Sequence, residues 1–312
     1  MKNTLYIKIL IACSALLVSF WASEAQAGAK GSFERTLSVD EAILLDVSSG
    51  SGSITISSGG AGTVTVVGHI KVGSAWSSRS GAEAKDLVAK FEANPPVELE
   101  GGRLQVGHIK DKAYRRNVSV SYEIVVPANT EVISDTGSGS QKVSGIAAPV
   151  NADTGSGSIT LADIGGPVTA NTGSGRIKAE RVAGAFEAHT GSGSITMTQV
   201  APGDVEATTG SGSIDLQGVV GGLRAKAGSG RIVIQGSQAG DWKINTGSGS
   251  VKIDLPDDAA FRLDAESSSG GITIDHPVTV QGKISKRHLR GEVRGGGNEL
   301  YIDTGSGSIK VL

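Results

Sequence analysis

The phrase Thr154-Gly-Ser-Gly-Ser-Ile159 decides how this chain folds, because the sequence repeats it at nearly constant intervals. The first glycine of each copy falls at residues 137, 155, 173, 191, 210, 228, 247 and 305, and Ser268 takes this place in a degenerate copy. The intervals are 18 or 19 residues, with one of 21, and the last, of 37 residues, is two spacings. A fixed period of this length is typical of proteins that stack one structural unit many times.

Within one unit, residues 150–167, apolar and polar side chains alternate. Val150 and Ala152 fall on one face and Asn151 on the other, and the same alternation resumes at Ile159. This period of two residues is typical of a strand and not of a helix. We therefore expect two short strands per unit, joined by the Gly-Ser-Gly corner and followed by a second glycine corner. At both corners we expect glycine to supply positive φ angles.

Stacking the units aligns their apolar residues in columns. One column contains Val150, Val168, Phe186, Val205, Leu223, Trp242, Leu263 and Leu300; another contains Ile159, Ile177, Ile195, Ile214, Ile232, Val251, Ile272 and Ile309. No unit can bury its apolar face alone, so the predicted fold is all-β: a single-stranded parallel β-helix, or β-solenoid, with about 18–19 residues per rung. The general preference of parallel crossovers favours a right-handed coil.

A left-handed coil of hexapeptides would share the eighteen-residue period. It requires an apolar residue at every sixth position, but counting on from Ile159 reaches Gly165 and Asn171. The hexapeptide alternative therefore fits the sequence poorly.

The first 27 residues have the three parts of an export signal. Lys2 and Lys8 precede an apolar run, and Ala25-Gln-Ala27 is a small-residue cleavage site. We therefore predict a removable signal peptide at 1–27 and an exported protein, located in the periplasm or at the cell surface. The alternative is a lipoprotein site at Cys13, which would leave only a short apolar region before the modified cysteine.

Composition excludes several classes of protein. Cys13 is the only cysteine, so a chain that loses its signal has no disulfide, thiol nucleophile or cysteine-ligated metal. Without residues 1–27 the chain carries 27 Lys and Arg against 30 Asp and Glu, a balance that argues against binding of nucleic acid by a basic surface. Outside the signal no apolar run is long enough to span a membrane.

The rest of the chain divides into two regions. Residues 131–312 contain the regular array, and residues 28–130 are expected to form irregular rungs with one helix at 82–94, which caps the rod or decorates its side. Near the C-terminus, the basic segment 276–298 is either a solvated loop or hairpin or a docking surface for an acidic partner. The chain then ends on a rung at 300–312, whose free edge needs a cover.

The outward columns supply the candidate sites. Asp135, Asp153 and Asn171 should stack in one column at roughly 4.8 Å spacing, where their oxygens could hold a calcium ion. The alternative is that such residues sit at bends because they hydrogen-bond nearby backbone amides. The Asp-Thr-Gly-Ser phrase at Asp135, Asp153 and Asp303 looks like that of aspartic proteases, but Asn171, His189 and Thr208 replace the aspartate in other copies, which marks the phrase as a corner.

Asp204, Glu206 and Asp215 lie close in the sequence and are candidates for the carboxylate pair of a carbohydrate-active enzyme. The five histidines, at positions 69, 108, 189, 276 and 288, show no spacing typical of a metal site and are expected to lie on the surface. We therefore assign no catalytic residue, no cofactor-binding residue and no cofactor, with calcium as the one ion to consider.

These features together resemble a bacterial family of exported β-strand-repeat proteins of unknown function, described as adhesins and likened to the heads of autotransporter adhesins. The matching segments are residues 33–39, the early Gly-Ser-Gly-Ser-Ile at 50–54, the strand at 121–127 and the repeated phrase. The resemblance covers essentially all of the chain after the signal. It implies a parallel β-helix and an adhesive role, with no site residues to transfer to this sequence.

The function predicted from these observations is that of a non-enzymatic exported β-solenoid, an adhesin or a structural and binding protein of the surface or periplasm. The expected partner is a surface ligand, either a glycan or a protein, with the oligomeric state left open. The alternative is a carbohydrate-active β-helix enzyme, either a polysaccharide lyase or a hydrolase.

Overall fold

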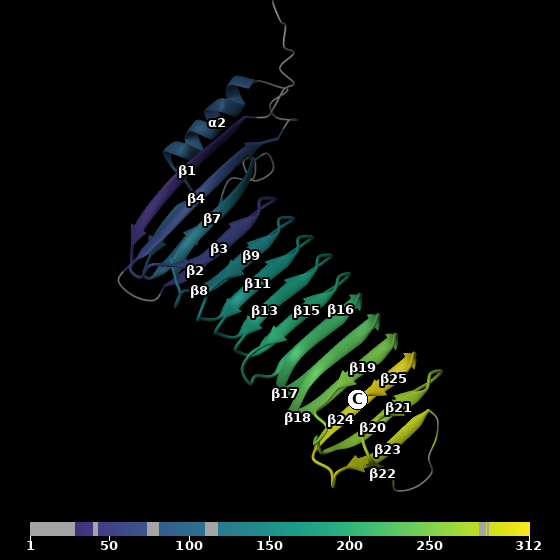
Figure 1. Ribbon diagram of the computed structural model, residues 1–312. Coiled ribbons are helices and arrows are strands. Elements are labelled where there is room, and N and C mark those ends of the chain that lie inside the picture. Colours follow the sequence, from purple (N-terminus) through teal and green to yellow (C-terminus); the bar gives the residue numbers. More distant parts are fainter. Residues whose placement is uncertain (1–28, 40–42, 74–80, 110–117, 281–284, 286) are drawn as a thin grey trace, which may run out of the picture.

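A computed structural model describes residues 29–39, 43–73, 81–109, 118–280, 285 and 287–312 of the chain. The predicted signal peptide at 1–27 and Cys13 lie outside these residues. In the described part, the chain forms an elongated rod of stacked rungs (Figure 1). Each regular rung contributes one strand to each of two parallel sheets, and the predicted β-solenoid is thereby confirmed.

Sheet one runs along the rod in the order β6 (Arg103–Val106), β2 (Leu44–Ser49), β8 (Glu131–Thr136), β10 (Val150–Thr154), β12 (Val168–Thr172), β14 (Phe186–Thr190), β16 (Val205–Ser211), the second half of β17 (Ile214–Ser229), the second half of β18 (Ile232–Ser248), β24 (Asn298–Ser306), β20 (Phe261–Ser267) and β23 (His288–Val293). Two short strands, β5 (Val97–Glu100) and β22 (Val278–Thr279), pair with β6 and β23.

Sheet two runs in the order β1 (Lys30–Ser38), β4 (Thr63–Val72), β7 (Val118–Pro127), β3 (Ile54–Gly59), β9 (Gln141–Ser144), β11 (Ile159–Ile164), β13 (Ile177–Val182), β15 (Ile195–Gln199), the first halves of β17 and β18, β19 (Val251–Asp254), β25 (Ile309–Val311) and β21 (Ile272–Ile274). Strand β4 is antiparallel to its two neighbours, β1 and β7, and the other neighbouring pairs are parallel.

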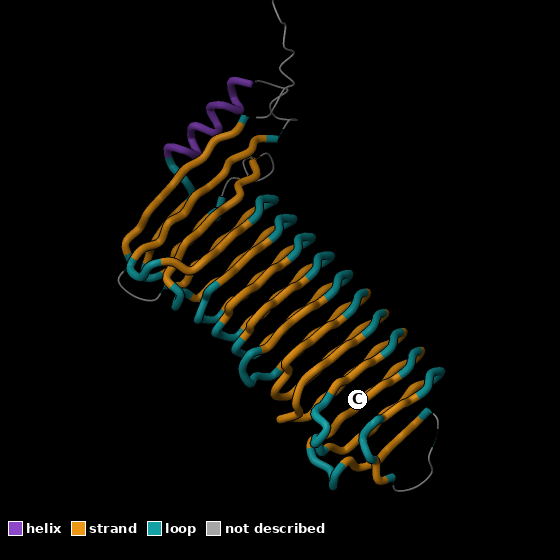
Figure 2. The backbone as a smooth tube through the Cα atoms, viewed as in Figure 1, coloured by secondary structure: helices purple, strands orange, loops and turns teal. Residues whose placement is uncertain are grey.

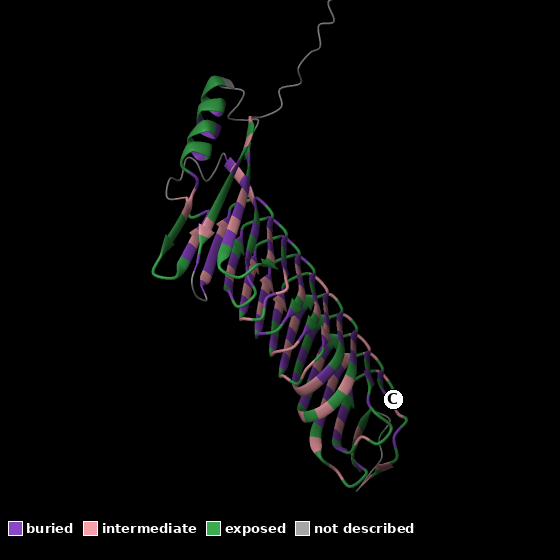
Figure 3. Cartoon of the chain, turned by 60° about the vertical axis from the view of Figure 1, so that its left-hand side comes forward, coloured by how far each residue is buried: buried purple, intermediate pink, exposed green. Residues whose placement is uncertain are grey.

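The predicted columns are in register. Ile159 lies opposite Ile177, which lies opposite Ile195, and all three are fully buried. The column that starts at Val150 also forms, and its Trp242 is 1% exposed. Figure 3 shows the resulting alternation of buried and exposed residues along each strand. Burial of this continuous apolar interior is the main stabilising term of the fold.

The reason for the corner glycines differs from our expectation. Among the corner glycines of the phrase, only Gly212 and Gly230 have a positive φ, of 157° and 153°. Elsewhere glycine is needed because the stacked backbones approach closely: a Cβ added to Gly157 would lie 1.8 Å from the carbonyl oxygen of Gly139 on the preceding rung. The prediction of positive φ was therefore wrong at all of these corners except those of Gly212 and Gly230, because contact between rungs and not turn type selects glycine. Figure 2 shows these corners stacked along one edge of the rod.

The second corner also departs from expectation. Glycine was predicted to supply positive φ at Gly165 and Gly166, but neither has it; the left-handed residues of this corner are Gly145 and Gly218, with φ of 74° and 70°, and Asp163 and Arg181, with φ of 56° and 57°. The side chains of the last two lie on adjacent rungs, with Arg181 Nε donating to Asp163 Oδ1 at 2.5 Å. Asp163 and Arg181 therefore form an ion pair across rungs while both adopt a backbone conformation that non-glycine residues seldom adopt.

The threonine of the phrase forms a buried ladder of hydrogen bonds. Thr154 Oγ1 accepts from the amide of Gly157 and donates to the carbonyl of Gly139, both at 3.1 Å. Thr172 repeats the pattern one rung later, donating to the carbonyl of Gly157 at 2.8 Å. The hydroxyl therefore satisfies backbone groups of two rungs at once, which explains why a polar residue occupies an inward position.

The order of rungs corrects our view of the C-terminus. The last rung, β24 and β25, was expected to end the rod with a free edge, but it lies between the rung of β18 and β19 and the rung of β20 and β21. Figure 1 places the C-terminus within the stack accordingly. After β19 the chain skips one rung position and forms the rung of β20 and β21 beyond it. It then returns, and β24 and β25 occupy the skipped position.

The N-terminal end is built in a similar way. The rung of β2 and β3 pairs directly with β8 and β9, and the intervening chain, with β6 and β7, stacks on its other side. The predicted helix is α2 (Gly81–Ala93), and its expected apolar face of Ala84, Leu87, Val88 and Phe91 is buried. The helix contacts β1 and β4 at this end of the rod (Figure 1). None of the described helices has the length and apolar character needed to cross a membrane.

Candidate binding face

The outer face of sheet one carries carboxylates on or beside four of the five successive strands from β8 to β16, and only β12, with outward Thr169 and Asn171, has none. We call this surface the acidic face and define it by Glu131, Asp135, Asp153, Glu187, Asp204 and Glu206, on or immediately before β8, β10, β14 and β16. These residues point outward because their sequence neighbours, such as Val132 and Val205, belong to the buried columns. The strands β8, β10, β12, β14 and β16 contain no lysine or arginine. Every Asp, Glu, Lys or Arg side chain of these five strands is therefore a carboxylate, although the chain as a whole is nearly neutral.

One part of the acidic face contains the predicted calcium candidates. Asp135, Asp153 and Asn171 are in register on adjacent strands, and they line a shallow hollow of about 410 Å³ together with His189 and Thr208. Asn171 Nδ2 donates to Asp153 Oδ1 at 2.7 Å, so the amide turns its nitrogen and not its oxygen to the carboxylate. Among the described residues, no group of three or more acidic, histidine or cysteine side chains is arranged to hold a metal ion.

The charge of Asp135 is poorly compensated. Partial burial and the neighbouring Asp153 carboxylate raise the pKa of Asp135 above its usual range, and His108 opposes them only in part. Like charges directly opposite each other in adjacent strands are destabilising. This column therefore has a small electrostatic cost to the fold.

A second hollow, of about 440 Å³, lies on the same sheet, and its lining includes Glu187, Asp204, Glu206, Arg224 and Asp241. Asp204 Oδ1 accepts from the amide of Gly222 at 2.8 Å, and Glu206 lies 3.9 Å from Arg224. The predicted enzyme candidates are thus brought together only in part, because Asp215 lies on the other sheet.

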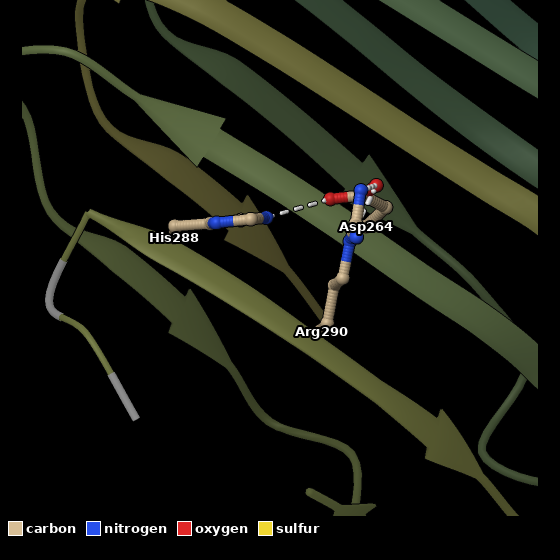
Figure 4. A network of polar contacts seen from close by, with 3 residues as sticks. All are labelled: Asp264, His288 and Arg290. Atoms are coloured by element: carbon tan, nitrogen blue, oxygen red, sulfur yellow. Dashed lines mark hydrogen bonds and ion pairs between the residues drawn. The ribbon is translucent and has the colours of Figure 1, made fainter. Parts of the chain in front are cut away.

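The structure also reveals two clusters that the sequence did not suggest, one at each end of sheet one. Near the C-terminal end, Asp264 accepts from His288 Nε2 at 3.0 Å and from Arg290 Nη2 at 2.6 Å, which joins β20 to the end strand β23 (Figure 4). Burial alone would raise the pKa of Asp264, but the hydrogen bonds from Arg290 and His288 outweigh it and hold the pKa below its usual range.

The cluster at the N-terminal end has the same composition. Asp46 on β2 contacts Arg103 at 2.5 Å and His108 at 3.0 Å. Burial opposes ionisation here too, yet the bond from Arg103 and the charge of His108 keep the pKa of Asp46 low. Asp46 and Asp264 occupy the same outward column, so each end strand of sheet one is fastened by an aspartate at the same position. Arg103 and His108 lie 57 and 62 positions after Asp46 in the sequence, so no local spacing could indicate these contacts.

Most of the histidines, and part of the basic segment 276–298, take part in contacts of this kind. His108, His189 and His288 lie against carboxylates, whereas His276 is buried and stacks edge-on against Phe261, contrary to the expected surface position. The segment 276–298 contributes β22 and β23, which form a hairpin as one of the two alternatives predicted. Lys283 and Lys286 in this segment lie outside the described residues.

Six chains of solved structures match this chain, two of which are described here, and none of the curated proteins matches it. A candidate cell adhesion protein from Clostridium sporogenes is 12% identical, with 90% of this chain and 99% of that chain covered and a TM-score of 0.21. A candidate adhesin from Bacteroides fragilis is 11% identical, with 91% and 99% covered and a TM-score of 0.38. The profile of the Toastrack DUF4097 family matches residues 45–312, and the chain therefore belongs to that family, as its resemblance to the β-strand-repeat proteins implied.

Proposed function

We propose that this protein is an exported, non-catalytic binding protein of the adhesin type, which binds a glycan or protein partner through the outer face of sheet one. The acidic face is the observation that carries the proposal. It extends over five adjacent strands, roughly 24 Å along the rod at the usual strand spacing, and Glu187 of one hollow contacts His189 of the other at 3.0 Å.

The architecture supports binding over catalysis. The repeated elements of the sequence, namely the corner glycines, the threonine ladder and the apolar columns, all act inside the rod and hold it rigid. The outward positions vary from rung to rung, which produces an extended surface of mixed chemistry. A rigid scaffold that presents varied side chains in fixed positions is suited to recognition.

Two measurements test this proposal. Fractionation of cells that express the full chain should find the protein outside the cytoplasm, with mass spectrometry placing its new N-terminus at Gly28. Binding of the purified protein to glycan and protein arrays should be lost in the double variant Glu187→Gln, Glu206→Gln and kept in Lys85→Gln, a control on the exposed side of α2. Retention in the cytoplasm, or array binding that survives the double variant, would contradict the proposal.

A carbohydrate-active enzyme is the second candidate, and the carboxylates around the 440 Å³ hollow are the observation that favours it. Two carboxyl groups in one cleft can act as acid and base or nucleophile on a glycosidic bond. An enzyme of this kind should release reducing ends or unsaturated sugars from some member of a polysaccharide panel, and should lose this activity in Glu206→Gln. We expect no turnover.

A further inference from the structure

The two outer faces of the rod differ in charge. On sheet two, the outward positions on or immediately before the strands from β9 to β25, apart from the Asp163–Arg181 ion pair, carry six cations and three anions. The cations are Lys142, Arg176, Lys178, Arg231, Lys252 and Lys310, and the anions are Glu180, Asp215 and Asp254. All six cations are exposed. We call them the basic strip. Although the positive and negative charges of the whole chain nearly balance, the rod therefore has an acidic face on one sheet and a basic strip on the opposite sheet.

The like charges within each face are not needed for folding. Asp135 lies opposite Asp153, Glu187 opposite Glu206, and Lys252 opposite Lys310. Each such pair costs the fold up to about 1 kcal/mol.

Elsewhere the same solenoid pairs opposite charges across rungs, as in Asp163 with Arg181. The fold can thus neutralise charges between rungs. On these two faces it does so only in part: Glu206 lies 3.9 Å from Arg224 and Lys178 lies 2.7 Å from Glu180, but the like-charged pairs remain opposite each other. Charges that repel within one molecule are relieved when a complementary surface covers them.

From this complementarity we propose that copies of the protein associate side by side, with the acidic face of one copy against the basic strip of the next. Both surfaces are flat sheets with the same repeat along the rod, since every regular rung contributes one strand to each. Because the two surfaces are on opposite sheets, the contact is heterologous and extends into an open row of rods.

The size of the contact indicates its strength. Five strands of about five residues present roughly 24 Å by 17 Å, or about 400 Å². A stable interface buries about 800 Å² on each partner. The contact should therefore be weak and dominated by charge, and it should dissociate as the screening length falls from about 30 Å at 0.01 M salt to about 3 Å at 1 M.

This inference rests on the same acidic face as the proposed function. Its test uses only the purified protein, with no glycan or protein partner, so a negative result in one test does not decide the other. Sedimentation velocity at 10 mM salt should show mass rising with protein concentration, and at 0.5 M salt a monomer. The variants Glu187→Lys, Glu206→Lys and Lys252→Glu, Lys310→Glu should each remain monomeric alone. Mixed in equal amounts, they should associate again, because the first variant keeps an intact basic strip and the second keeps an intact acidic face.

The control variant Lys85→Glu, Lys90→Glu, with the same number of reversed charges on α2, should associate like the wild type. Circular dichroism should show that all variants keep the sheet spectrum. The proposal is overturned if the wild type stays monomeric at 10 mM salt, if either face variant still associates alone, or if the mixture fails to associate. It is also overturned if a lysine-rich peptide binds the acidic face while the protein remains monomeric, since the partner would then be a cationic segment of another molecule.

Discussion

Replacement of the corner glycine Gly157 by alanine should destabilise the rod strongly, although the change adds only one methyl group. The new Cβ would lie 1.8 Å from the Gly139 carbonyl oxygen, whereas ordinary contacts begin at 3.4 Å, so the two rungs would have to separate locally by about 1.6 Å. Three hydrogen bonds cross or close this corner: Gly157 N to Thr154 Oγ1, Thr154 Oγ1 to Gly139 O, and Thr172 Oγ1 to Gly157 O. At about 1 kcal/mol each, their loss predicts a destabilisation of about 3 kcal/mol.

Urea unfolding followed by far-ultraviolet circular dichroism measures this effect. Gly60→Ala is the matched control, because a Cβ there meets no atom within 4 Å and its φ is not positive. It should be neutral or raise the free energy of unfolding by a few tenths of a kcal/mol. A Gly157→Ala free energy of unfolding within about 0.5 kcal/mol of that of Gly60→Ala would refute close approach as the reason for the repeated glycines.

Three further changes test the ladder and the charges. Thr172→Val removes a buried hydroxyl that bonds two rungs and should cost about 1–3 kcal/mol in urea unfolding, while Thr169→Val on the outward face of the same strand should cost little. Asp264→Asn should hasten proteolysis of the β22–β23 hairpin at neutral pH, whereas Asp258→Asn should not. Because the pKa of Asp264 is lowered in the folded state, its contribution is present above the unfolded value of about 3.9 and is lost as the pH falls through the folded pKa, so the two proteins should converge in acid. Asp135→Asn should raise the melting temperature slightly at neutral pH, and the gain should disappear below about pH 4, because the raised pKa of Asp135 means that its ionised form disfavours the fold. A melting temperature lowered by Asp135→Asn would contradict this account.

The sequence predicted the regular part of the fold well because the repeat encodes it locally. The alternation around Val150 and Ile159 specifies which residues face inward, and the period of the phrase specifies which residues become neighbours on adjacent rungs. The helix α2 at the N-terminal end of the rod was also predicted, since Leu87 and Phe91 recur at helical spacing before a pair of prolines. These features depend only on short-range patterns, which a single sequence displays.

The candidate site was predictable only in part. The column of Asp135, Asp153 and Asn171 followed from the period, but the grouping of Glu187 with Asp204 and Asp241 around one hollow is seen only in the tertiary structure. The segregation of charge between the two sheets was invisible in the overall balance. It emerges only when each residue is assigned to a sheet and to a side of that sheet.

The sequence alone therefore determined the solenoid, its rung length and its apolar interior, because a strand period and a repeat period are properties of the chain itself. Only the tertiary structure decided the order of the terminal rungs, the end clusters at Asp46 and Asp264, and the opposite charge of the two faces. The physical reason is that these features come from contacts between segments tens of residues apart. The position of β24 between β18 and β20 is one example. Any rung with the same apolar columns could occupy that position, so the sequence pattern does not specify which rung does.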